Sequence, residues 1–292
     1  MIALLRPHQW TKNLFVLVGT VFGHAWGNSA QLYAAGMAFI AFCAISSAAY
    51  ILNDWVDRTR DAAHPQKRNR ALASGKVSGA FAAWIAGLLV VTAFGVAYLA
   101  APGVMMCIAA YAVLNALYSR WLKHVVVIDV FCIAGGFMLR ILAGTHGIGI
   151  PASSWLLFCG GMLTLFLAFA KRRGEIATLP AGHGEDIPRV SSSSRPVLDH
   201  YTLPLLDNFL VITAACCVIA YGLYTMSAET IRVHGTAKLI YTLPLVLYGL
   251  FRYLYLLQAG SASEDISRDF LRDWHLCMTV AVWLVVTVSL IL

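Results

Sequence analysis

The stretch NDWVDRTRDAAHPQKRNRALASG, residues 53–75, gathers a high density of opposite charge in a very apolar chain. Its acidic half places Asn53, Asp54, Asp57 and Asp61 within nine residues. On an α-helix, at about 100° per residue, these four side chains fall within an arc of roughly 100°. The sequence therefore predicts three carboxylates and one carboxamide on one face of a helix end.

Carboxylates this close repel one another, and a divalent cation relieves the repulsion. Oxygen ligands suit Mg²⁺, which completes its shell with water and substrate phosphate. The basic half follows Pro65, which cannot continue a regular helix, so Lys67, Arg68 and Arg70 are expected on a loop. Arg and Lys bind phosphate oxygens through charge-assisted hydrogen bonds. We interpret the stretch as the two halves of a diphosphate site. The simpler alternatives are a solvated helix end with scattered acids for the acidic half, and positive-inside anchoring for the basic half.

The composition favours an all-α, polytopic membrane protein. Of the 292 residues, 60% are hydrophobic and 12% charged, with a mean hydropathy of +0.73; soluble domains carry about 25% charged residues. We expect one integral membrane domain over residues 1–292. About nine segments are near the length that crosses a bilayer: 13–26, 30–60, 77–100, 103–121, 125–145, 153–178, 204–226, 236–257 and 274–292.

The charges predict the orientation. If the N-terminus shares a side with every second connection, all of the 21 lysines and arginines except Arg140, Arg232 and Lys238 fall on or near that side. The positive-inside rule makes this side cytoplasmic, in the plasma (inner) membrane. It also explains the net charge of +7 without a nucleic-acid partner. All 14 acids except Glu229 gather there too, although acids contribute little to the rule, which indicates a site facing the cytoplasm. The sequence does not specify the oligomeric state, and a homo-oligomer is compatible with it.

Several other segments carry a family resemblance: RPHQWTKN (6–13), YSRWLK (118–123), KRRGE (171–175) and RPVLDHY (195–201). Together with the acidic motif, they make the chain similar to the UbiA-type membrane prenyltransferase superfamily, in its decaprenyl-phosphate phosphoribosyltransferase branch. The resemblance implies a bundle of nine transmembrane helices that binds a diphosphate through Mg²⁺. It also implies transfer of 5-phosphoribose from phosphoribosyl pyrophosphate to a polyprenyl phosphate, with release of pyrophosphate. Ala71 departs from the branch, where proline is typical.

The implied reaction gives each candidate residue a role. Asp54, Asp57 and Asp61 are the expected Mg²⁺ ligands, with Asn53 beside them. Catalysis is assigned to Asp57, Asp61, Lys67 and Arg68, the last two acting with Arg70 on the phosphates of the sugar donor. The lipid phosphate or the sugar 5-phosphate is expected at Lys12, Lys123, Lys171 and Arg172. The ribose hydroxyls are expected at Tyr118, Glu175 and Tyr201. Arg140 either lines the cavity together with Asp129 or packs against another helix.

Two alternatives remain open. A prenyltransferase that moves a prenyl group from a prenyl diphosphate to an aromatic or lipid-headgroup acceptor would use the same aspartates. Such enzymes carry a second acidic motif near the sixth span, whereas residues 163–178 here contain one acid, Glu175, beside three bases. A lipid-phosphate transporter is the other alternative, and it predicts polar residues along several helices through the membrane and often an inverted repeat. The charge concentrated at one end argues against it.

Overall fold

The computed structural model describes residues 2–23, 25–63, 68–177, 196–259 and 272–292, and every regular element within these ranges is a helix. Eight helical segments are long and apolar enough to cross a membrane. They are α3 (Ser29–Val56), α5 (Gly79–Ala100), α6 (Pro102–Arg120), α7 (Ile128–Ala143) continued by η4 (His146–Ile148), α8 (Ser154–Ala177), α9 (Leu203–Met226), η6 (Lys238–Thr242) continued by α11 (Leu243–Gln258), and α13 (Trp274–Ile291).

Shorter helices cap and connect these segments. They are α1 (Ile2–Leu5), η1 (Pro7–Leu17), α2 (Val18–Phe22), η2 (Ala25–Gly27), α4 (Arg58–Ala63), η3 (Leu122–His124), η5 (Pro196–His200) and α10 (Ala228–His234). The first expected span, 13–26, therefore differs from the other eight, because it comprises the end of the 3₁₀ helix η1, the short helix α2 and the start of η2. A 3₁₀ helix rises about 2.0 Å per residue and an α-helix about 1.5 Å, so residues 7–22 extend over about 30 Å.

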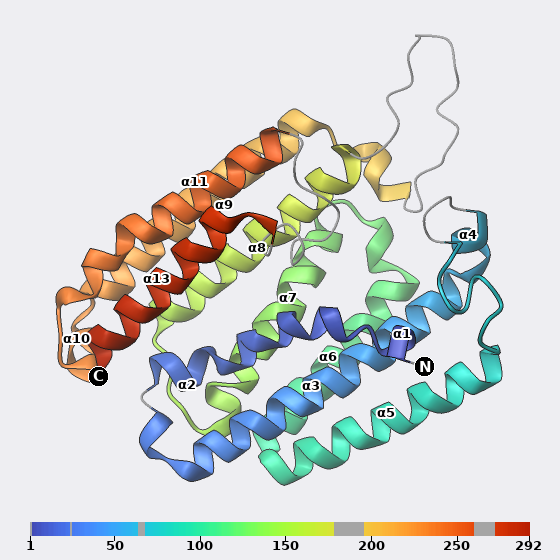
Figure 1. The fold of residues 1–292 in the computed structure, drawn as a ribbon, viewed down its shortest axis with the longest axis horizontal. Helices are drawn as coiled ribbons and strands as arrows, with labels where there is room; N and C mark the ends of the chain where they lie inside the picture. The colour runs from blue at the N-terminus through green and yellow to red at the C-terminus, as the bar shows by residue number, and fades with distance from the viewer. Residues whose placement is uncertain (1, 24, 64–67, 178–195, 260–271) are drawn as a thin grey trace.

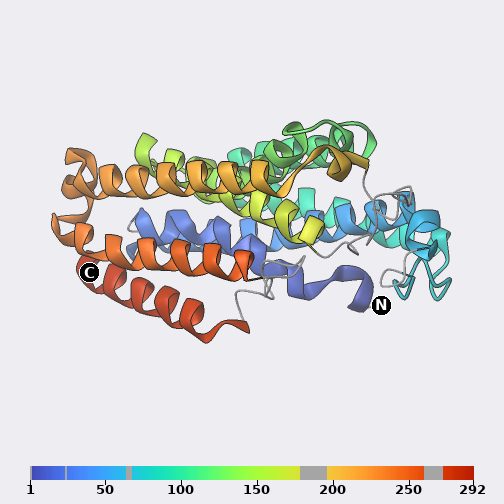
Figure 2. The same cartoon turned by 90° about the horizontal axis from the view of Figure 1, so that it is seen from above.

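The bundle has two groups of helices with α7 and α8 between them. Figure 1 shows α3, α5 and α6 on one side and α9, α11 and α13 on the other. Within each group, neighbouring helices pack directly: α3 against α5, and α11 against both α9 and α13. In Figure 2, α9, α11 and α13 lie in that order across one end of the bundle. Each group has its own buried apolar cluster, one around Phe42 and Ile108 and the other around Phe166 and Leu206.

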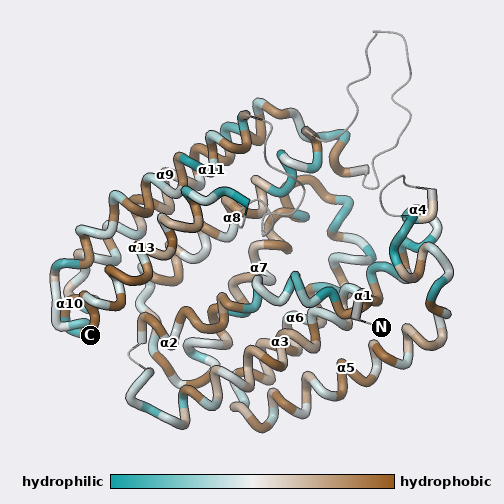
Figure 3. Tube along the Cα trace, viewed as in Figure 1, coloured by the Kyte–Doolittle hydropathy of each residue, from teal (hydrophilic) through white to brown (hydrophobic). Residues whose placement is uncertain are grey.

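Polar residues collect at one end of this bundle. The trace in Figure 3 is apolar along the long helices and hydrophilic around α4 and the start of η1. The outward faces of the long helices expose large apolar side chains such as Val91 (72% exposed) and Met106 (71%). Apolar side chains on the outside and a polar end are the arrangement that a lipid-embedded helical bundle requires.

The N-terminal segment, residues 7–22, packs directly on the backbone of α7. A Cβ atom added to Gly144 would lie 1.6 Å from the carbonyl oxygen of Val16, and one on Gly19 would lie 1.8 Å from that of Gly144. One turn earlier, Arg140 Nε donates a hydrogen bond to Asn13 Oδ1 over 2.7 Å. Glycine at both positions therefore lets the segment that carries RPHQWTKN reach the centre of the bundle.

Candidate functional site

The acidic motif occupies the junction of α3 and α4. Helix α3 ends at Val56, and Asp57 is its C-cap with φ −89° and ψ 5°. Helical hydrogen bonding nevertheless continues, because the Asp57 N–H donates to Asn53 O over 2.9 Å and the Asp61 N–H donates to Asp57 O over 2.8 Å. The four side chains consequently keep the angular order expected of one helix, in which Asp54 and Asp61 lie about 20° apart.

Asp54 and Asp61 converge on one guanidinium group. Arg70 Nη1 lies 3.1 Å from Asp54 Oδ1 and 2.6 Å from Asp61 Oδ2. Arg6, from the residue just before η1, places Nη2 at 2.7 and 2.6 Å from the two oxygens of Asp54. The side chains of Asp54 and Asp61 are only 12% and 4% exposed. The structure thus gives these buried carboxylates cationic partners from the N-terminus and from the basic half of the motif.

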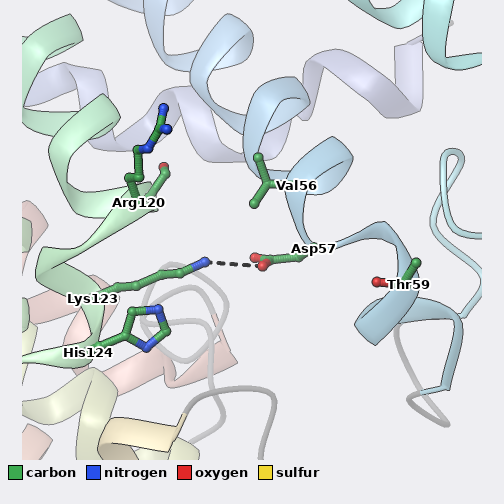
Figure 4. Close-up of a pocket in the computed structure, with 7 residues that line it drawn as sticks. Val56, Asp57, Thr59, Arg120, Lys123 and His124 are labelled. Atoms are coloured by element: carbon green, nitrogen blue, oxygen red, sulfur yellow. Dashed lines mark hydrogen bonds and ion pairs between the residues drawn. The ribbon is translucent and has the colours of Figure 1, made fainter.

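Asn53 and Asp57 face the other way, toward the end of α6. Lys123 Nζ lies 3.1 Å from Asp57 Oδ1, and the Ser119 hydroxyl donates a hydrogen bond to Asn53 Oδ1. A cavity of ≈ 350 Å³ opens between the two elements. Figure 4 shows Lys123 reaching across it toward Asp57, with Arg120 and His124 on the same side as Lys123. The cavity is lined by Val56, Asp57, Thr59, Ser119, Arg120, Lys123 and His124.

Asp54 and Asp61, two of the three predicted metal ligands, share one cation position. Asp54 and Asp61 each contact the same positively charged nitrogen of Arg70, so their oxygens already surround one cation position. Carboxylate oxygens are the donors that Mg²⁺ takes in proteins. Asp57 points instead at Lys123, and across the described ranges no three acidic, histidine or cysteine side chains form a group that could hold a metal ion. Asp54 and Asp61 therefore offer donors that fit Mg²⁺ at one position, and Asp57 stays a predicted ligand.

A second polar cluster lies at the C-terminal end of α8, and ion pairs and hydrogen bonds join its members to one another. Arg172 Nε lies 2.5 Å from Asp129 Oδ2, its Nη2 donates to the Tyr118 hydroxyl over 2.9 Å, and its Nη1 pairs with Glu175. The Tyr201 hydroxyl donates to Asp129 Oδ1 over 2.7 Å. Four expected substrate ligands thus bind one another around Asp129, and none of them lines the cavity.

The remaining candidates lie apart from the cavity. Arg140 is 5% exposed and is held by Asn13, by the Gly136 carbonyl and by the Tyr111 hydroxyl, so the structure supports the packing alternative and separates it from Asp129. Lys12 bonds to a neighbouring glutamine of η1, and Lys171 is half-buried on α8. Arg68 is exposed after α4, and Lys67 lies outside the described residues.

Sequence reasoning missed four residues of the site: Arg6, Ser119, Arg120 and His124. The first three stand inside the segments that carried the resemblance, RPHQWTKN and YSRWLK, and His124 follows directly. The signal is therefore present in both segments, from which the sequence analysis predicts Lys12, Tyr118 and Lys123 as site residues. Only the fold shows that Arg6 reaches Asp54 across 48 positions of sequence.

Comparisons with known proteins agree with the fold. The model described as UbiA prenyltransferase family matches residues 3–274. The decaprenyl-phosphate phosphoribosyltransferase of Mycolicibacterium smegmatis is 32% identical over 235 residues, covering 78% of this chain and 71% of that protein. Its counterpart in Corynebacterium glutamicum is 30% identical over 299 residues, covering 97% and 87%.

Solved structures show the same fold at lower identity. A UbiA homolog from Archaeoglobus fulgidus bound to GPP and Mg²⁺ superposes with a TM-score of 0.74 at 16% identity, covering 99% of this chain and 98% of that one. The same homolog bound to DMAPP and Mg²⁺ gives 0.72. The family match covers most of the chain, and the helical bundle is consistent with it. The chain therefore belongs to the UbiA prenyltransferase family.

Proposed function

We propose that this chain transfers 5-phosphoribose from phosphoribosyl pyrophosphate to a polyprenyl phosphate of the decaprenyl type, with release of pyrophosphate. The observation that carries the proposal is the cavity in which acidic Asp57 faces a basic wall formed by Arg120, Lys123 and His124. This reaction brings together a diphosphate, a sugar phosphate and a lipid phosphate, and three such groups need many cations. The names of the Mycolicibacterium and Corynebacterium relatives support the same reaction.

The residues around the acidic motif can serve the departing pyrophosphate. Asp54 and Asp61 are the residues that would hold Mg²⁺, with Asp57 a predicted third ligand, and the bound ion would supply positive charge against the leaving group. In the structure, Arg6 and Arg70 form ion pairs with these carboxylates. With Mg²⁺ held by these carboxylates, the guanidinium groups of Arg6 and Arg70 would be available to bind phosphate oxygens. Departure of pyrophosphate then breaks the bond to the anomeric carbon.

The acceptor needs positioning more than activation. A lipid phosphate is already anionic at neutral pH, so its oxygen can attack the anomeric carbon without a strong general base. Lys123, Arg120 and His124 are the cationic or imidazole groups nearest to Asp57 across the cavity, and we assign them to phosphate groups facing the acidic motif. Attack opposite the leaving pyrophosphate inverts the anomeric carbon. We place this site on the cytoplasmic side of the plasma membrane, where the soluble donor is available.

The decisive experiment supplies the purified protein in lipid nanodiscs with phosphoribosyl pyrophosphate, decaprenyl phosphate and Mg²⁺. The expected product is a phosphoribosylated lipid detected by mass spectrometry, and it should be lost in Asp57→Asn. Formation of a prenylated acceptor from a prenyl diphosphate, with no phosphoribosylated lipid, would establish the prenyltransferase alternative. Movement of lipid phosphate across vesicles without either product would establish the transporter.

A further inference from the structure

The connection between α6 and α7 carries Lys123, and one buried guanidinium group ties its two ends together. Tyr118, in the last turn of α6, accepts a hydrogen bond from Arg172 Nη2 over 2.9 Å. Asp129, in the first turn of α7, pairs with Nε of the same group at 2.5 Å. Arg172 thus bridges positions on either side of η3, the short helix that presents Lys123 to Asp57.

The same connection contains a strained residue that Tyr201 holds in place. Val127 has φ 68° and ψ −44°, and a β-branched residue at positive φ is a conformational outlier that its surroundings must enforce. The Val127 N–H donates to the Tyr201 hydroxyl oxygen over 2.7 Å. That hydroxyl in turn donates to Asp129 over 2.7 Å. One hydroxyl group therefore fixes both the strained residue and the carboxylate that Arg172 binds.

The burial of Arg172, Asp129 and Tyr201 argues against direct contact between their side chains and substrate. The side chains of Arg172 and Asp129 are both 0% exposed, and Tyr201 is 5% exposed. Burial and the hydrogen bond to Asp129 raise the pKa of the Tyr201 hydroxyl above its ordinary value, so it stays protonated and continues to donate. Their polar atoms contact one another and the turn formed by residues 121–127. Of that turn, Lys123 and His124 line the cavity, together with residues from the α3–α4 junction and the end of α6.

We propose that Arg172 and Tyr201 are positioning residues that hold the 121–127 turn so that Lys123 faces Asp57 across the cavity. The proposal rests on the phosphoribosyl transfer inferred above. It gives Arg172 and Tyr201 a structural role in place of the direct substrate contacts predicted from the sequence. Arg suits the role because its planar fork reaches Tyr118 and Asp129 at once, which a lysine ammonium cannot do in the same geometry.

The first test measures the turn without substrate. Tyr201→Phe removes one oxygen atom, and Tyr224→Phe is the matched control, because Tyr224 is also buried (3% exposed) and its hydroxyl bonds to His234 at the far end of α9 over 2.9 Å. Hydrogen–deuterium exchange of peptides covering 119–129 should become about fivefold to tenfold faster in Tyr201→Phe, because the Val127 N–H loses its acceptor and such a bond contributes about 1 kcal/mol. It should stay unchanged in Tyr224→Phe. Unchanged exchange in Tyr201→Phe would overturn the proposal.

The second test asks whether Tyr201 acts through Lys123. Tyr201→Phe should lower kcat/KM about tenfold in the otherwise unchanged chain, but less than twofold in a Lys123→Ala background, because coupled positions are not additive. Losses that multiply would mean that Tyr201 contacts substrate or supports the fold independently, and they would refute positioning through Lys123. Arg172→Lys should resemble Tyr201→Phe, and full activity in that variant would contradict the bridging role.

These two tests also separate this proposal from the proposed function. If the unsubstituted protein makes no phosphoribosylated lipid, the function is wrong, but the exchange measurement still decides whether Arg172 and Tyr201 order the turn. If the lipid forms and exchange does not respond to Tyr201→Phe, the function stands and the positioning role is wrong.

Discussion

Replacing Arg70 with alanine should make the chain bind Mg²⁺ more tightly while it impairs catalysis. Arg70 Nη1 contacts Asp54 Oδ1 at 3.1 Å and Asp61 Oδ2 at 2.6 Å, so these two oxygens lie within about 6 Å of each other. With an effective dielectric constant of about 20, their repulsion at that separation is about 3 kcal/mol. Arg6 still neutralises Asp54, and Arg70 is 31% exposed, so solvent screening reduces the net effect to about 1–2 kcal/mol.

That energy corresponds to about a tenfold lower dissociation constant for Mg²⁺ in Arg70→Ala. The assay is thermal unfolding in detergent micelles, followed by tryptophan fluorescence at increasing Mg²⁺ concentration, since a ligand of the folded state raises the melting temperature. Arg252→Ala is the matched control, because Arg252 is similarly exposed (26%) and pairs with Asp273 at 2.7 Å on other helices. Equal Mg²⁺ responses in the two variants, or none in either, would refute the claim that Arg70 occupies a cation position.

Four further outcomes are expected. Asp57→Asn should lower kcat/KM about 100-fold with little change in melting temperature, because Asp57 is 33% exposed and such ion pairs contribute about 0–1 kcal/mol. Gly144→Ala should lower the melting temperature by several degrees, since its Cβ would overlap a backbone oxygen at 1.6 Å; Gly95→Ala, in open space on α5, should not. Arg140→Ala should cost about 3 kcal/mol of unfolding free energy by leaving buried acceptors unpaired, measured by thermal unfolding against Gly95→Ala. The rate ratio of unsubstituted protein to Tyr201→Phe should stay constant from pH 6 to 9, because the raised pKa keeps Tyr201 protonated and its contribution is lost only above about pH 10.

The long helices could be predicted from the sequence because apolar length is a direct physical requirement of a bilayer. Eight of the expected spans correspond to long helices with bounds near those predicted. The N-terminal segment is the exception, because a short apolar stretch does not specify which type of helix forms. Residues 7–17 adopt the more extended 3₁₀ form, and their polar residues find partners inside the bundle, as Asn13 does with Arg140.

The acidic motif was only partly predictable for a geometric reason. Helical spacing groups Asp54 with Asp61 and Asn53 with Asp57, and the structure keeps both pairs. Spacing cannot say which neighbouring element meets each side of the arc. The pairs therefore diverge toward Arg70 on one side and α6 on the other, which no reading of residues 53–61 in isolation could reveal.

The basic segment of α8, residues 171–173, shows a second limit of prediction from a single sequence. A run of basic residues at a membrane boundary favours phosphate binding, so the sequence predicts that Arg172 binds a substrate phosphate. The structure instead buries its guanidinium completely against Asp129, 43 positions earlier in the chain. A single sequence does not reveal that pairing, because nothing in the spacing of α7 and α8 specifies which faces meet. In the structure Arg172 forms ion pairs with two carboxylates of the protein, those of Asp129 and Glu175.

The balance of charge at the acidic motif has a thermodynamic consequence. Each of its carboxylates already holds a cationic side chain: Asp54 holds Arg6 and Arg70, Asp61 shares Arg70, and Asp57 holds Lys123. Phosphate groups must therefore compete with carboxylates for these cations. A divalent ion bound by the carboxylates would free the same side chains for phosphate, so each ligand would favour binding of the other, and by linkage the coupling is reciprocal. Binding of a simple monoanion would break these ion pairs without supplying a metal ion to the carboxylates. Such an anion would therefore bind more weakly than a diphosphate that arrives together with a divalent ion.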